Sequence, residues 1–142
     1  MISASEPGGL ILELQRATHA VLHALAGRLA GMDLNASEIN VLANLADGRS
    51  RSIGELASAT ATKPTTLTSV LDRLVRKGHV TRELDPADRR SFRVSLTADG
   101  RRAADASHEA MGDLEAAALA TITAADIAGF RAVAGALAEP AR

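Results

Sequence analysis

The chain has 142 residues, 30 alanines, no cysteine and only two aromatic residues, Phe92 and Phe130. This length fits one domain, with or without a helical arm, and the missing cysteine excludes disulfides, thiolate catalysis and cysteine-ligated zinc. Many alanines and few aromatics favour closely packed helices over a sandwich or barrel. The net charge of −1 argues against a nucleic-acid partner when it is taken over the whole chain. The sequence has neither a signal-peptide pattern nor an apolar run long enough for a membrane span, so we expect a cytoplasmic protein with no membrane partner.

Apolar residues at spacings of three and four predict two helices at the start of the chain. The first covers 10–29, and Gly31 is expected to cap it. The second begins at Asn35, because Asn35 and Glu38 have the spacing of a capping box, and it ends at 47–48, an Asp-Gly pair.

Two further helices follow, separated by a tight turn. Ser52 and Glu55 form another capping box, which opens a short helix over 53–60. Pro64 then occupies the first turn of a helix over 64–77, where its missing N–H is tolerated. A short helix, a turn and a second helix are the parts of a helix-turn-helix.

After these helices the apolar pattern changes its period. Apolar and polar residues alternate over 80–84 and again over 92–96, which predicts two strands. The segment between them, 85–91, is polar and contains a proline near its start. We therefore expect a hairpin with a charged tip.

Two more helices complete the chain. Thr97 caps a long helix over 98–121, Thr123 caps the last helix, and Pro140 stops it. Taken in order, the elements predict a mainly α fold with a small β-hairpin wing, that is, a winged helix-turn-helix flanked by helices at both ends.

Charge is distributed unevenly along the chain. Residues 49–102 hold twelve basic and six acidic side chains, a net +6, whereas the rest holds four basic and eleven acidic ones, a net −7. A basic segment of this kind is typical of a polyanion-binding surface, because Lys and Arg displace counterions from phosphates. Solvated surface charge is the alternative, but the basic segment coincides with the helix-turn-helix and hairpin.

The exposed side of the helix over 64–77 carries residues suited to reading the major groove. Hydroxyls can meet phosphates or base edges, and arginine can contact guanine bidentately. The alternative, a threonine-rich start that caps its own helix, explains Thr62 but not hydroxyls that continue to Ser69. The candidate DNA-binding residues of this helix are Lys63, Thr65, Thr66, Thr68, Ser69, Arg73 and Arg76.

At this point the sequence resembles the MarR (multiple antibiotic resistance regulator) family. The specific signal is the hairpin, with Asp-Pro-x-Asp-Arg-Arg at 85–90 followed by Val-x-Leu-Thr-x-x-Gly at 94–100. The resemblance covers nearly the whole chain. Further matching segments are Leu56-Ala57, the threonine-rich turn, Val70-Leu71-Asp72-Arg73-Leu74 and Lys77-Gly78-His79-Val80.

The resemblance implies a homodimeric regulator, a repressor more often than an activator, that binds a pseudopalindromic operator in double-stranded DNA. It makes 64–77 the recognition helix and Arg90, with Arg89 beside it, the arginine that enters the minor groove. It also implies that Asp88 holds the wing in shape by pairing with an arginine. Physical chemistry agrees with the role of Arg90, because a guanidinium suits the more negative potential of a narrow minor groove.

Dimerisation is also expected from the apolar stripes of the terminal helices, which a thin winged-helix core could not cover. A two-fold dimer would bury them and space two recognition helices about 34–36 Å apart. We thus predict an N-terminal dimerisation helix in 1–34, a DNA-binding lobe in 35–97 and C-terminal dimerisation helices in 98–142. The expected interface residues are Leu10, Leu14, Ile127, Phe130, Val133 and Leu137.

The resemblance further implies a small aromatic or anionic effector, bound between the dimerisation helices and the DNA-binding lobe. Arg16 lies one turn before His19, and His19 and His23 are four residues apart, which could form an anion-binding face. Met111 is the candidate apolar contact from the long helix. Ordinary core or surface histidines are the alternative, and without a third ligand the pair predicts no metal site.

Two other classes of protein are weighed against a regulator. An enzyme is not expected, because we find no nucleophile–base arrangement, no glycine-rich phosphate loop after a strand and no metal triad; we accordingly expect no cofactor. The other alternative is a winged-helix module that binds a protein without sequence-specific DNA binding. A basic recognition helix beside a basic wing favours DNA, because protein docking requires neither.

Overall fold

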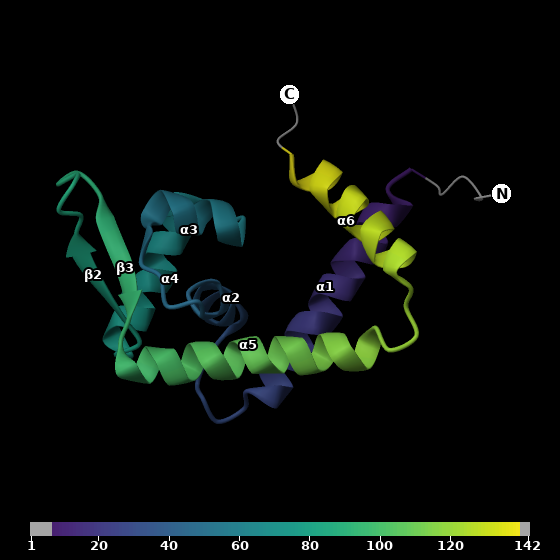
Figure 1. Cartoon of the computed structure of the whole chain (residues 1–142), viewed down its shortest axis with the longest axis horizontal. Coiled ribbons are helices and arrows are strands. Elements are labelled where there is room, and N and C mark those ends of the chain that lie inside the picture. The colour runs from purple at the N-terminus through teal and green to yellow at the C-terminus, as the bar shows by residue number, and fades with distance from the viewer. Residues whose placement is uncertain (1–6, 140–142) are drawn as a thin grey trace.

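The computed structural model describes residues 7–139 and divides into a lobe and an arm along one long helix. Figure 1 shows α5 running the length of the molecule, with α2, α3, α4, β2 and β3 over one end and α1 and α6 over the other. Both ends of the described chain lie on the arm. The elements are α1 (Gly9–Arg28), α2 (Ala36–Asn44), β1 (Arg51–Ser52), α3 (Ile53–Thr60), α4 (Pro64–Arg76), β2 (Val80–Leu84), β3 (Phe92–Leu96), α5 (Ala98–Ala118) and α6 (Ala124–Ala138).

The helix starts lie where the capping residues predict. Asn35 and Ser52 each accept a hydrogen bond from the backbone N–H three residues on, and the glutamate there accepts one in return. Thr97 accepts a hydrogen bond from the N–H of Gly100 and caps α5 in the same way. These side chains satisfy N–H groups that the first helical turn leaves without partners.

Three helices end earlier than predicted. The helix α1 ends at Arg28 and α2 at Asn44, whereas Gly31 and Gly48 lie three and four residues further on in left-handed conformations. After α2 the backbone hydrogen bonds join residues three apart, as in a 3₁₀ turn. The α-helix therefore ends before the glycine at which the chain changes direction. The end of α5 is Ala118 rather than 121, and the predicted stop at Pro140 lies outside the described residues.

The sheet has three antiparallel strands in the order β1-β3-β2. The hairpin confirms both predicted strands, with Val80 opposite Leu96 and Leu84 opposite Phe92. The strand β1 was not predicted, because two residues are too short to show alternation; it pairs Arg51 with Val94. This third strand anchors the base of the wing to the start of α3.

The lobe has a leucine-rich core, and the arm does not. Leucines and valines from α2, α3, α4, β2 and β3 pack together with Ala103 and Ala104, so the first turns of α5 belong to the lobe. A smaller cluster joins Leu25 of α1 to Ala110 of α5. In contrast, α6 has no buried residue, and Phe130 is 61% exposed. Within 7–139, no helix combines the length and the apolar character needed to cross a bilayer.

Candidate nucleic-acid interface

The helix α4 has one face in the core and one in solvent. Leu67, Val70, Leu71 and Leu74 are buried, because they recur at helical spacing and meet the rest of the lobe. The opposite face exposes Thr65, Ser69 and Arg76, together with Thr66 on its flank and Lys63 just before the first turn. The structure thus brings most of the predicted recognition residues to one hydrophilic surface.

Two predicted recognition residues are placed differently from the others. Thr68 is exposed, but its hydroxyl donates to the carbonyl of Pro64 at 2.9 Å, which leaves only its acceptor lone pairs free. Arg73 is half-buried on the flank of α4 that faces α2, and it lines a hollow with Glu38 and Lys77. Its buried Nε has no acceptor among the described residues. Arg73 is therefore not part of the exposed centre of the recognition surface.

An ion pair joins the wing to α4. A guanidinium nitrogen of Arg82, on β2, lies 2.6 Å from Asp72 Oδ1 on α4. Both side chains are partly exposed, so the pair contributes more to orientation than to stability. It positions the base of the hairpin beside α4.

The tip of the wing is shaped by backbone hydrogen bonds. The N–H of Arg90 donates to Asp88 Oδ1 at 3.0 Å, and the N–H of Ser91 donates to the carbonyl of Asp88 at 3.1 Å. Carboxylates that accept from the backbone two residues on are a common device of turns. Arg89 and Arg90 are both exposed, and neither forms an ion pair within the described part of the chain.

The expected pairing of Asp88 with an arginine is wrong in this structure. Arg93 on β3 instead lies 3.6 Å from Asp85, at the other end of the tip, and donates to the hydroxyl and carbonyl of Ser50. Asp88 acts through the backbone, because its carboxylate is already engaged by the turn. The wing is thus held by two aspartates with different roles.

An apolar groove separates α1 from α6 on the arm. It has a volume of 310 Å³ and brings together five of the six expected interface residues from the two ends of the chain. Those five are Leu10, Leu14, Phe130, Val133 and Leu137. Ile127 is half-buried on α6 and does not line the groove. The terminal helices therefore share one apolar surface that the rest of the described chain leaves uncovered.

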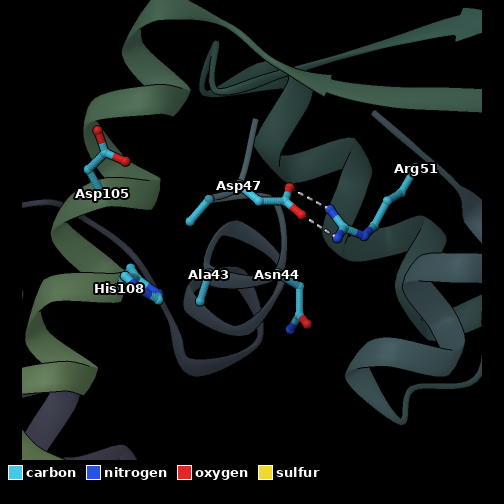
Figure 2. Close-up of a pocket in the computed structure, with 7 residues that line it drawn as sticks. Ala43, Asn44, Asp47, Arg51, Asp105 and His108 are labelled. Atoms are coloured by element: carbon cyan, nitrogen blue, oxygen red, sulfur yellow. Dashed lines mark hydrogen bonds and ion pairs between the residues drawn. The ribbon is translucent and has the colours of Figure 1, made fainter. Parts of the chain in front are cut away.

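A polar hollow of 360 Å³ lies between α2 and α5 (Figure 2). The carboxylate of Asp47 accepts two hydrogen bonds from the guanidinium of Arg51, at 2.9 and 2.7 Å. This pairing holds the pKa of Asp47 far below its usual range and raises the pKa of Arg51. Asp105 and His108 line the facing side on α5, one turn apart, as Figure 2 shows.

The predicted effector residues do not gather in that hollow. Arg16, His19 and His23 are exposed on α1 and line none of the hollows described here. Met111 lies in a separate apolar groove with Val21 and Leu25, on the side of α1 opposite the histidines. Sequence reasoning missed Asp105, whose spacing from His108 was the only signal. Across 7–139 no three His, Asp or Glu side chains come close enough to hold a metal ion.

The fold defines a winged helix-turn-helix protein, because it contains a helix-turn-helix whose second helix exposes a hydrophilic face and a hairpin that carries arginines. Solved structures confirm this predicted fold. The model of the MarR family matches residues 31–91. The multiple antibiotic resistance protein MarR of Escherichia coli (strain K12) is 31% identical over 133 residues, which cover 90% of this chain and 92% of that protein. The chain belongs to the MarR family of transcriptional regulators, as the sequence motifs predict.

Two solved structures show how closely the fold agrees. CouR from Rhodococcus jostii RHA1, bound to p-coumaroyl-CoA, has a TM-score of 0.82 at 24% identity, over 99% of both chains. BpsR from Bordetella bronchiseptica, whose DNA binding is regulated by 6-hydroxynicotinic acid, has a TM-score of 0.75 at 24% identity, over 94% of this chain and 100% of that one. At these identities the likeness establishes the shared fold.

Proposed function

We propose that this protein is a homodimeric repressor that binds a pseudopalindromic operator in double-stranded DNA and is released by a small-molecule effector. The observation that carries the proposal is an exposed hydrophilic surface of the lobe. It consists of the exposed face of α4 and the wing tip with Arg89 and Arg90, held together by the pair of Asp72 and Arg82.

Each part of this surface has a partner on B-DNA. A helix of the width of α4 fits the major groove, where Thr65, Ser69 and Arg76 can meet base edges or phosphates. The wing tip then lies beside the neighbouring minor groove, where a free guanidinium such as that of Arg90 is attracted to the negative potential. The segment 49–102 supplies the net positive charge that favours such an encounter.

The arm supplies the second half of the proposal, which is the dimer. Residues 1–34 and 98–142 would form the dimerisation arm, and 35–97 the DNA-binding lobe, against which the first turns of α5 pack. Support comes from α6, which is almost entirely apolar and has no buried residue in one protomer. A monomer that left the groove between α1 and α6 open would expose the large apolar side chains of Leu10, Phe130, Val133 and Leu137 together.

For the effector, we propose the polar hollow between α2 and α5. It lies between α2 with the segment up to Arg51 on one side and α5 on the other, so a bound molecule would contact the lobe and the long helix that leads to the arm. CouR is bound to p-coumaroyl-CoA, and the DNA binding of BpsR is regulated by 6-hydroxynicotinic acid. His108 offers a donor to such a ligand, whereas the amide of Asn44 already donates to Asn40 and Asp47 is already occupied by Arg51.

The wing assignment is tested by replacing Arg90 with alanine. We expect operator affinity to fall by roughly 30-fold or more, because each of two half-sites loses one arginine contact worth about 1–3 kcal/mol. Fluorescence anisotropy on the operator measures the affinity, and light scattering checks that the dimer persists. Arg28→Ala, an exposed arginine on α1, serves as the control and should bind like wild type. Unchanged affinity of Arg90→Ala would refute the role of the wing.

A further inference from the structure

A partly buried ion pair connects the C-terminal end of α4 to the start of α2. The Nζ of Lys77 lies 2.8 Å from Oε2 of Glu38 and 3.1 Å from its Oε1, and it donates to the carbonyl of Asp33 at 2.5 Å. Glu38 is only 1% exposed, whereas Lys77 is half-buried. One ammonium group thus joins α4, α2 and the connection between α1 and α2.

Glu38 has two tasks at this point. Its Oε1 accepts the N–H of Asn35 and completes the capping box of α2, and its carboxylate also neutralises Lys77. Burying a charged carboxylate this deeply destabilises the fold unless the group is paired and hydrogen-bonded. The ammonium group of Lys77 is therefore held by Glu38. Although Lys77 counts in the basic segment, its charge is directed into the protein and away from the exposed face of α4.

The pair adds a directional polar contact to the apolar packing of α4. Leu67, Leu71 and Leu74 hold one face of α4 against the core, and polar contacts on the flanks of the helix restrain it further. The pair of Lys77 and Glu38 acts on one flank of the helix, and Asp72 with Arg82 acts on another. The two ion pairs therefore hold α4 from two sides in addition to its packing in the core.

We propose that Glu38 and Lys77 are positioning residues for DNA recognition: they orient α4 for the major groove without touching DNA. The proposal rests on the proposed function, because it names how the recognition surface of that function is aligned. It predicts that the pair affects DNA affinity through geometry and not through charge.

The substitution Glu38→Gln distinguishes a positioning role from an effect of charge, because the two predict opposite changes in DNA affinity. The substitution removes one negative charge per protomer, so electrostatics alone would tighten DNA binding. The amide keeps an oxygen for the capping hydrogen bond, and Lys77 is exposed enough to reach water. We expect DNA affinity to fall about 5-fold or more while the slope of log K against log[salt] stays unchanged, because no phosphate contact is lost.

Two matched variants serve as controls. Glu55 occupies the same capping-box position in α3 but is exposed and forms no ion pair within the described residues. Glu55→Gln should therefore bind DNA as tightly as wild type or more tightly. Lys63→Met removes an exposed lysine at the other end of α4 and should reduce the salt slope by about two, one phosphate contact in each protomer.

The outcomes of the experiment are distinct. Affinity of Glu38→Gln that equals or exceeds that of wild type would overturn the proposal. If Glu38→Gln folds poorly, the double variant Lys77→Met/Glu38→Gln, which leaves no unpaired charge, takes its place. A salt slope reduced by about two in the double variant would show that Lys77 contacts phosphate, which also overturns the proposal.

A measurement without DNA separates this proposal from the proposed function. Amide hydrogen exchange should show faster exchange over the last turn of α4, residues 73–77, in Glu38→Gln than in Glu55→Gln. Equal exchange in the two variants would contradict a positioning role. If wild type itself bound no DNA, the proposed function would fail, while the exchange comparison would still report on the tie between Lys77 and Glu38.

Discussion

Replacing Phe130 with glutamate is expected to produce a monomer that binds the operator about two orders of magnitude more weakly than wild type. Phe130 is largely exposed in one protomer and lines the groove between α6 and α1. Burying a phenylalanine side chain contributes about 1.5–3 kcal/mol to the free energy of association. In a two-fold interface the substitution removes this contribution from both subunits. The monomer then binds one half-site without the gain of 10²–10⁴ that linkage to a second site provides.

Light scattering at micromolar concentration measures the mass, and anisotropy measures the affinity. Arg131→Glu introduces the same charge at the next position of α6, where the chain already tolerates a charged side chain. That variant should stay dimeric. A Phe130→Glu protein that remained a stable dimer would exclude this groove as the interface.

Replacing Gly100 with alanine is expected to lower the melting temperature by about 10 °C, which corresponds to roughly 3 kcal/mol. Gly100 is buried in the first turn of α5, and a Cβ there would overlap the backbone carbonyl of His79. That carbonyl accepts the N–H of Thr97, whose hydroxyl donates to the carbonyl of Gly78 at 2.6 Å. A side-chain rotation cannot relieve the clash, because backbone groups lie on both sides of it.

Gly112→Ala is the matched control in the same helix. Gly112 is exposed, and an added Cβ would meet nothing within 4 Å. Alanine favours a helix over glycine by about 1 kcal/mol, so this variant should melt at a higher temperature than wild type. Thermal unfolding followed by circular dichroism compares the two. A stabilising effect of Gly100→Ala would mean that α5 does not pack against the turn after α4 as described.

Local signals explain which parts of the fold could be predicted. Both capping boxes and the period-two strands at 80–84 and 92–96 involve residues close in sequence, and all are present at the predicted positions. The strand β1 could not be found in the same way, because its two residues become a strand only by pairing with β3. The resemblance identified Gly100 as part of a motif, and the structure adds the reason, which is the contact with His79.

Residues of the candidate site could be predicted where their exposure follows from the periodicity of one helix. They could not be predicted where their surroundings come from residues far away in the sequence. Thr65 and Ser69 lie on the expected face of α4. The sequence placed Arg73 with them, but the burial of its flank is caused by the connection between α1 and α2, which lies about forty residues earlier in the sequence. The same separation, 39 residues, hides the pair of Glu38 and Lys77 from any reading of the sequence alone.

Selection of bound DNA from a random pool, with the full chain as the binding protein, tests the proposed function most directly. We predict enrichment of a two-fold symmetric sequence whose half-sites are centred one helical turn, about 10–10.5 base pairs, apart. Such a site would reflect two copies of α4 related by the dimer axis. A pool without any enriched sequence, or one with a single unsymmetric motif, would contradict a dimeric operator-binding regulator.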